Sequence, residues 1–202
     1  MSRGFSRLRF GQRFAVAMVL IGLAGALSAR GAGGFGKAPK LGEKAPAFTL
    51  TAIDGRHVTL ANEVARGPVV LVLLRGWPGY QCPFCTRQFA DFLEHAPELD
   101  AARARVVWVY PGPADQVQQR AREFAASRAL PRNFVVVPDP DYVFTNAYGL
   151  RWDEPQETAY PATFVVDRSS VVRFAQISIG HDQRARAIDV LKALGALSPA
   201  RR

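Results

Sequence analysis

Residues 69–88 read VVLVLLRGWPGYQCPFCTRQ, and they carry the strongest structural signal in the chain. The first six of these residues are apolar, as in a central β-strand that is covered on both faces. A helix is predicted from Thr86 to His95, and Pro83 can occupy its first turn, where a missing N–H costs nothing. Cys82 and Cys85 are the only cysteines of the chain. A Cys-x-x-Cys at a strand-to-helix junction is typical of proteins that make and break a disulfide.

The two sulfurs are expected to differ in reactivity. Cys82 falls at the predicted N-cap, where the helix dipole and free N–H groups favour an anion, so its pKa should lie below the ordinary value of about 8.5. We expect Cys82 to be accessible and Cys85 to point inward with Phe89 and Phe92. This asymmetry suits chemistry in which one thiolate attacks a partner and the second cysteine resolves the mixed disulfide.

Strands and helices alternate along the rest of the chain. Strands are predicted at 47–51, 57–60, 106–110, 134–137, 162–167 and 171–178, and helices at 114–128, 141–148 and 182–194. This order predicts a three-layer α/β domain with a mixed central sheet. In the last helix, Ile188, Leu191 and Leu194 should face inward. Arg184 and Arg186 are expected on its solvated face.

The N-terminus departs from this globular pattern. Residues 1–29 combine a basic start, an apolar run and small residues, which is the layout of a secretory signal peptide. An uncleaved N-terminal anchor is the alternative. Residues 30–40 form a Gly-rich flexible linker, and the folded domain is expected at 41–197. We therefore predict that the protein is exported, to a periplasmic or extracellular location, with membrane anchoring left open.

Charge gives no indication of nucleic-acid binding. The net charge is +9, but the first 30 residues hold five arginines and no acidic residue, and without them the excess is +4.

Exported proteins meet an oxidising environment, so a binding module with a structural Cys82–Cys85 disulfide is an alternative. A two-residue spacer gives such a disulfide the least stabilisation. Zinc would need two more ligands from His57, His95 and His181, so we expect neither a metal nor a cofactor.

Three segments resemble the thioredoxin-like superfamily, and within it the alkyl hydroperoxide reductase C/thiol-specific antioxidant branch with its peroxiredoxin-like (redoxin) proteins. They are VLVLLRGW (70–77) followed by CPFCTRQ (82–88), GEKAPAFTL (42–50) and PATFVVD (161–167). The family often has Arg-Gly-x-Trp-Cys-Pro-x-Cys, whereas this chain has extra residues between Trp77 and Cys82. The resemblance, over 41–195, implies a thioredoxin-like α/β/α sandwich and a thiol-based oxidoreductase with antioxidant activity.

The resemblance leaves two activities open. In a thioredoxin-type reductase, Cys82 would attack and Cys85 would resolve. Pro161, which precedes an apolar strand, would then be the family's cis-proline. In a peroxiredoxin, the motif Pro-x-x-x-Thr-x-x-Cys would run from Pro78 to Cys85, with Cys82 in place of the threonine. Cys85 would then be peroxidatic and Cys82 could resolve it.

Peroxiredoxins also place an arginine where this chain has Tyr160-Pro161, so Arg75 or Arg151 would have to replace it. We therefore favour a thiol–disulfide oxidoreductase that acts on protein disulfides over a thiol peroxidase. Its partners would be thiol or disulfide proteins or a peroxide, with a membrane-bound electron donor as a further candidate, and the oligomeric state stays open. Trp77 either flanks the site or packs in the core, and His181 is expected to be solvated.

Overall fold

The computed structural model describes residues 37–126 and 129–197. The predicted signal segment, 1–29, and the first part of the predicted linker lie outside these residues. The last four linker residues are described, and Ala38 and Pro39 are buried, so the packed structure includes part of that linker. Within the described ranges, no helix is both long and apolar enough to cross a membrane.

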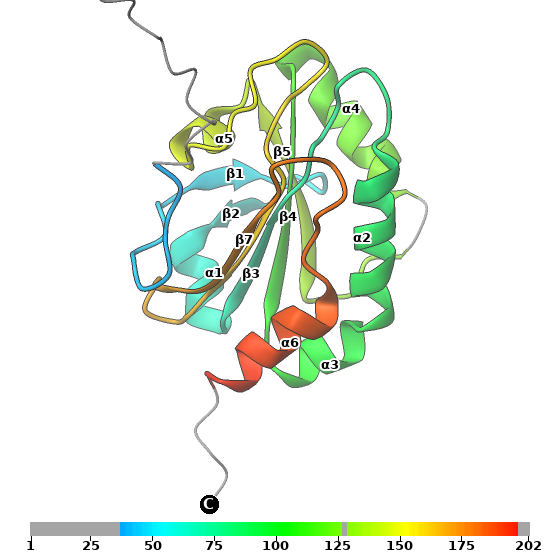
Figure 1. Cartoon of the computed structure of the whole chain (residues 1–202). Helices are drawn as coiled ribbons and strands as arrows, with labels where there is room; N and C mark the ends of the chain where they lie inside the picture. The colour runs from blue at the N-terminus through cyan, green and yellow to red at the C-terminus, as the bar shows by residue number, and fades with distance from the viewer. Residues whose placement is uncertain (1–36, 127–128, 198–202) are drawn as a thin grey trace, which may run out of the picture. The chain divides into compact units, whose positions relative to one another are not determined.

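Five strands form a mixed sheet in the order β5-β4-β3-β6-β7 (Figure 1). Their bounds are Val69–Leu73 for β3, Arg105–Gly112 for β4, Phe134–Pro140 for β5, Ala162–Val166 for β6 and Val172–Ile177 for β7. Strands β3, β4 and β5 are parallel, and β6 is antiparallel to both β3 and β7. The apolar strand that precedes the cysteines is therefore the middle strand, as predicted.

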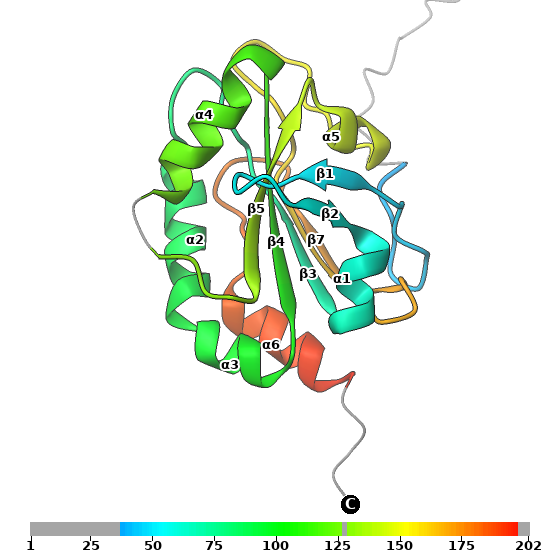
Figure 2. The same ribbon diagram turned by 180° about the vertical axis from the view of Figure 1, so that it is seen from behind.

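Each face of the sheet is covered by its own layer (Figures 1 and 2). One layer contains α2 (Pro83–Glu94), α3 (Ala96–Ala101), α4 (Ala114–Ala125) and α6 (Ala187–Gly195). The other contains the hairpin β1 (Thr49–Thr51) and β2 (His57–Thr59), α1 (Leu60–Arg66) and α5 (Val143–Ala147). The predicted three-layer arrangement with a mixed sheet is confirmed, although the sequence pattern did not predict α1 or α3.

Side chains of β3 alternate between two apolar cores, because successive residues of a strand point to opposite faces. Val70 and Val72 enter the core under α2, where the rings of Phe89 and Trp108 lie 4.9 Å apart. Val69 and Leu71 belong to the core on the other face. Burial on both faces explains why this strand is apolar throughout.

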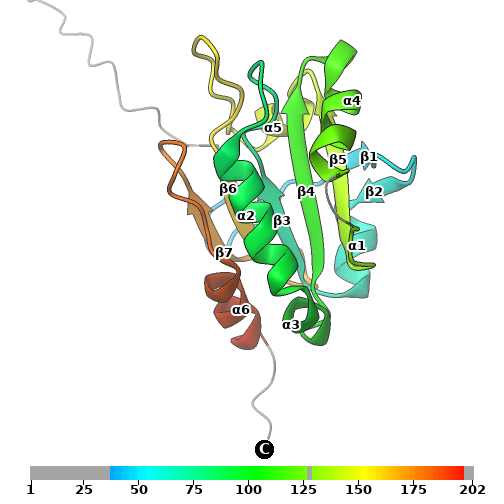
Figure 3. The ribbon, with the colours of Figure 1, turned by 90° about the vertical axis from the view of Figure 1, so that its right-hand side faces the viewer.

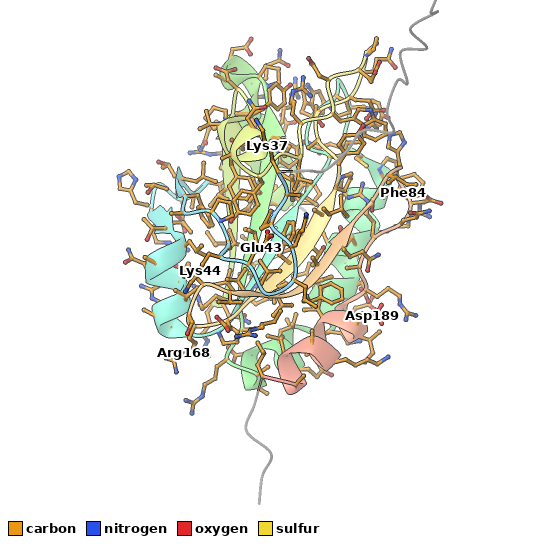
Figure 4. The ribbon with its side chains drawn as sticks, turned by 60° about the vertical axis from the view of Figure 1, so that its left-hand side comes forward. Lys37, Glu43, Lys44, Phe84, Arg168 and Asp189 are labelled. Atoms are coloured by element: carbon orange, nitrogen blue, oxygen red, sulfur yellow. The ribbon has the colours of Figure 1, made fainter. Side chains whose placement is uncertain are left out.

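The N-terminal part of the described chain packs beside β7. Gly42 donates its N–H to the Val172 carbonyl, and Val172 donates to the Glu43 carbonyl, over 2.8 and 2.9 Å. Figure 4 shows Lys37, Glu43 and Lys44 on this segment. The segment therefore extends the sheet edge by one short, irregular strand-like connection.

Helix α6 begins later than predicted. It starts at Ala187 rather than near Asp182, and Ile188, expected to face inward, is 41% exposed. Residues 182–186 form a loop instead, and Gln88 of α2 fixes this loop by donating its Nε2–H to the Ala185 carbonyl over 3.0 Å. The Ala185 carbonyl is thus bonded to a side chain of α2 and lies in the loop that precedes α6.

The peptide bond before Pro161 is trans, so the predicted cis-proline is wrong. The chain is already extended before β6, since Tyr160 donates its N–H to the Leu150 carbonyl over 2.9 Å. The Pro161 carbonyl then accepts a hydrogen bond from the Ser178 N–H over 2.8 Å. The backbone on both sides of the bond therefore continues in one direction into the strand.

Gly76 fixes the turn that leads from β3 toward the cysteines. Its φ is +73°, a left-handed conformation that favours glycine, and a Cβ there would lie 1.9 Å from the Pro111 carbonyl oxygen. The next residue, Trp77, donates its N–H to that same carbonyl over 3.0 Å. Only a residue without a Cβ allows this close approach of the two backbones.

We predict that Gly76→Ala lowers the free energy of unfolding by more than about 1 kcal/mol, because the left-handed backbone alone costs an L-residue that much. The clash with Pro111 adds to this cost. The matched change Gly195→Ala, at an exposed helical position with open space around it, should be neutral or stabilising by up to about 1 kcal/mol. Urea unfolding monitored by tryptophan fluorescence measures both, and equal effects would contradict the role of Gly76.

Candidate active site: a buried cysteine pair

The cysteines lie at the end of the sheet at which the central strand β3 finishes. Leu73, the last residue of β3, pairs with Ala162, the first residue of β6, and Ala162 pairs with Ile177, the last of β7. The loops that follow β3 and β7 and precede β6 therefore meet at this end (Figure 3). Figure 4 shows Phe84, between the two cysteines, far from Arg168, which marks the other end of the sheet.

Local sequence places both sulfurs at the start of α2. Cys82 is the N-cap and Pro83 is the first helical residue, as predicted, and Cys85 follows within the same turn. Both cysteines are free thiols, and each is only 1% exposed. The expectation that Cys82 would be accessible is therefore wrong, since the loop between β7 and α6 lies against it.

Arg184 is the residue of this loop that contacts the thiols. Its Nη2 donates to both Cys82 Sγ and Cys85 Sγ, each at 3.8 Å. Its Nε donates to the His181 carbonyl over 2.7 Å, and its Nη1 is buried and has no hydrogen-bond partner among the described residues. The prediction that Arg184 lies on a solvated helix face is wrong, because it precedes α6 and points into the site.

The surroundings favour the thiolate of Cys82 over that of Cys85. The Cys85 S–H donates to the Cys82 sulfur and, with the N–H groups of Cys85 and Phe84 and the Arg184 charge, holds the pKa of Cys82 well below its ordinary value, against the effect of burial. These N–H groups point toward the sulfur and favour its anion, although the Cys82 side chain makes no N-cap hydrogen bond. Complete burial raises the pKa of Cys85 well above its ordinary value. Cys82 is therefore the better nucleophile of the reduced pair.

Arg75 lies beside the site and bonds to residues around it, although its guanidinium does not contact the sulfurs. Its backbone N–H favours the thiolate of Cys85. Its Nε donates to Glu157 Oε2 over 2.8 Å, and its Nη1 donates to the Tyr80 hydroxyl. Arg151 Nη1 donates to the backbone carbonyls of Trp152, Glu157 and Thr158. The sequence indicates Arg75 or Arg151 as the arginine that contacts the thiols. In the structure, Arg184 makes that contact.

Three further residues surround the site: His181, which contacts Glu157, Tyr110 of β4, and Trp77. His181 makes a hydrogen bond to Glu157, with its Nε2 2.9 Å from Oε1, and its side chain is 34% exposed, so it is less solvated than expected. The Tyr110 hydroxyl donates to Gln81 Oε1 over 2.7 Å, and burial raises the pKa of Tyr110. Trp77 is half-buried beneath the Arg120 guanidinium, 4.3 Å from the ring centre, so it belongs to the surround of the site and not to the deep core.

Sequence reasoning missed Arg184 and Glu157. Arg184 is 102 positions from Cys82, and its spacing fits a helical pattern that the structure does not follow. The one signal in this region is a polar run, HDQR at 181–184, that begins after Gly180 and interrupts the apolar spacing. Within the described part of the chain, no group of three or more His, Cys, Asp or Glu side chains is arranged to hold a metal ion.

Comparisons with known proteins identify the family of the chain. Residues 41–175 match the family model described as AhpC/TSA family. A Mycobacterium tuberculosis protein provisionally named a peroxiredoxin is 31% identical over 153 residues, which cover 72% of this chain and 91% of that protein. The match therefore includes nearly the whole of that relative.

Two solved structures share the fold. Peroxidoxin BcpB from Mycobacterium tuberculosis has a TM-score of 0.67 and 23% identity, covering 80% of this chain and 99% of its own. A Chlorobium tepidum protein provisionally described as thiol:disulfide interchange protein DsbE has a TM-score of 0.58 and 25% identity, covering 78% and 100%. The predicted thioredoxin-like fold is confirmed.

We predict that Arg184→Met raises the pKa of the Cys82 thiol toward its ordinary value, because the thiolate loses its nearest positive charge. Thiolate absorbance near 240 nm, followed against pH in the reduced protein, measures this shift. Arg186→Met is the matched control, since Arg186 is exposed and pairs with Asp189. An unchanged titration in Arg184→Met would contradict the assigned role.

Proposed function

The chain belongs to the AhpC/TSA family and is a thiol-based oxidoreductase, and from this premise we propose that it is a peroxidase that reduces small hydroperoxides through Cys82 and Cys85. The observation that carries the proposal is the Arg184 guanidinium. One nitrogen contacts both sulfurs, while the buried Nη1 has no partner within the described ranges and can donate to a peroxide oxygen. A buried donor without a partner is costly unless a ligand or water satisfies it.

Burial of the sulfurs supports a small substrate. Each cysteine is 1% exposed, so a folded protein disulfide cannot reach Cys82 unless the loop over it moves. A hydroperoxide needs room for two oxygen atoms at the sulfur. It also carries oxygen atoms that accept hydrogen bonds from a guanidinium.

The proposed reaction uses both cysteines. The Cys82 thiolate attacks one peroxide oxygen, the O–O bond breaks, and the released oxide takes up a proton and leaves as an alcohol or as water. Cys82 is then a sulfenic acid. The Cys85 thiol attacks the Cys82 sulfur, an S–S bond forms, and the hydroxyl leaves as water with the Cys85 proton. An external dithiol supplies the two electrons that return both cysteines to thiols.

This order differs from the one that the peroxiredoxin spacing implies, in which Cys85 attacks. The lowered pKa of Cys82 and the raised pKa of Cys85 favour Cys82 as the attacking sulfur. Arg184 lies at the same distance from both sulfurs and does not discriminate between them. The two assignments are distinguished by single-cysteine variants.

A thiol–disulfide oxidoreductase that acts on protein disulfides is the second candidate. It is favoured by a low-pKa cysteine at a helix N-cap with a protected second cysteine, and by the likeness to the DsbE-type structure. The trans bond before Pro161 removes the feature that sequence reasoning had added to this candidate. Thiol proteins remain proposed partners in either case, as the source of electrons.

We expect the reduced protein to consume hydrogen peroxide with dithiothreitol as reductant, far faster than dithiothreitol alone. Cys82→Ser should lose this activity by at least about 100-fold, because the attacking sulfur is gone. Cys85→Ser should complete one turnover and leave Cys82 as a trappable sulfenic acid.

The reverse pattern, with a sulfenic acid on Cys85 in Cys82→Ser, would transfer the attacking role to Cys85. Reduction of insulin without peroxide consumption would contradict the peroxidase and support the oxidoreductase. A protein with neither activity, whose cysteines only raise the melting temperature when oxidised, would act as a binding module.

We further propose that the protein works outside the cytoplasm, in the periplasm or beyond it, on the basis of the layout of residues 1–29. Residues 1–40 fused to alkaline phosphatase, which is active only after its disulfides form outside the cytoplasm, should give phosphatase activity in a bacterial host. The double change Leu20→Arg and Leu23→Arg breaks the apolar run and should abolish it. An inactive fusion that accumulates in the cytoplasm would contradict export.

A further inference from the structure

The position of Arg184 depends on His181. The Arg184 Nε donates to the backbone carbonyl of His181 over 2.7 Å. The side chain of the same residue is fixed elsewhere, because His181 Nε2 lies 2.9 Å from Glu157 Oε1. His181 therefore holds the guanidinium with its backbone while its ring anchors the loop to a carboxylate.

Glu157 is the anchor of this arrangement. Its other oxygen, Oε2, accepts a hydrogen bond from Arg75 Nε over 2.8 Å, and its side chain is only 12% exposed. Arg75 is itself buried and donates from Nη2 to the Gln156 carbonyl over 2.7 Å. One carboxylate thus joins the loop after β3, which leads to the cysteines, to the loop after β7, which carries Arg184.

We propose that His181 and Glu157 are positioning residues that hold the Arg184 guanidinium beside Cys82 and Cys85. Neither side chain is seen to touch a sulfur, and their effect is exerted through the location of a charge. The proposal rests on the redox use of the cysteine pair, which the proposed function also requires.

The effect of Arg184 on the Cys82 thiolate depends on the distance between the guanidinium and the sulfur. The interaction of two charges falls in inverse proportion to their separation, so a guanidinium that moves from 3.8 Å to about 7.6 Å from a sulfur loses about half of its effect on the thiolate. A change of side-chain rotamer produces a shift of that size in an arginine whose Nε is no longer fixed. A mobile Arg184 would also spend part of its time away from a bound peroxide.

A purely structural role for His181 is the alternative. Its ring lies 5.3 Å from the Trp152 ring and 6.4 Å from the Phe84 ring, so the residue also contributes packing. The bond from Gln88 to the Ala185 carbonyl is a second attachment of the same loop. A structural role would change stability and leave the ionisation of Cys82 as it is.

The test measures the first thiolate transition near 240 nm in the reduced full-length protein. His181→Ala should raise the apparent pKa of Cys82 by about half a unit or more, which is a threefold change in proton affinity. His181→Gln should restore most of the shift, because its amide N–H can donate to Glu157 as the imidazole does. Glu157→Gln, which keeps the shape but not the charge of the anchor, should act in the direction of His181→Ala.

His95→Ala is the matched control. His95 is 32% exposed and lies 3.5 Å from its carboxylate partner Asp91, but it sits at the opposite end of α2 from the cysteines. It should leave the thiolate transition unchanged. Two results would overturn the proposal: a folded His181→Ala protein with an unchanged transition, or a His181→Gln protein that is folded yet behaves like His181→Ala.

This experiment separates the inference from the proposed function, because it needs no peroxide turnover. A shifted transition in a protein without peroxidase activity would support the positioning role and remove the proposed substrate. Rapid peroxide reduction with no shift in His181→Ala would support the proposed function and overturn the positioning role.

Discussion

The contact between one guanidinium and two buried sulfurs is the constraint on which the candidate active site depends. A thiolate out of reach of water is unfavourable unless a charge or hydrogen bonds compensate it. Arg184 supplies the charge, and the Cys85 thiol and the first amides of α2 supply the hydrogen-bonding groups. Without these contributions, enclosure of Cys82 would raise its pKa and make it inert. The site is therefore closed and still favours the Cys82 thiolate, because the Cys85 thiol, the first amides of α2 and the Arg184 charge together offset the effect of burial.

The fold provides a rigid frame for that contact. Strand β3 lies in the middle of the sheet and is buried on both faces, so its end is a fixed point from which Gly76 and the loop to Cys82 depart. The sheet pairs the ends of β3, β6 and β7 in register, which brings residues 99 to 102 positions apart within 3.8 Å. Side chains at the junction then lock the loops to each other, chiefly Glu157 and Gln88.

Local sequence was enough to predict the frame. The apolar run of β3, the helix after the cysteines and the alternation of elements are set by nearest neighbours along the chain, and these predictions are confirmed. The position of Arg184 is not local, because it follows from how β7 returns beside β6 and from a hydrogen bond to Gln88 that ends the loop before α6. The exposure of Cys82 could not be predicted for the same reason, since the loop that covers it is distant in sequence. The conformation before Pro161 depends on the pairing of Tyr160 with Leu150, which no motif records.

The enclosed Arg184 also has a thermodynamic meaning for the oxidised protein. When the two sulfurs join, the negative charge disappears, but the cation and the amide groups aimed at Cys82 stay where they are. The protein thus stabilises the thiolate of the reduced form and not the disulfide form, so we expect the disulfide to be a good electron acceptor. In the proposed cycle, a donor of modest reducing power would then be enough to return the cysteines to thiols.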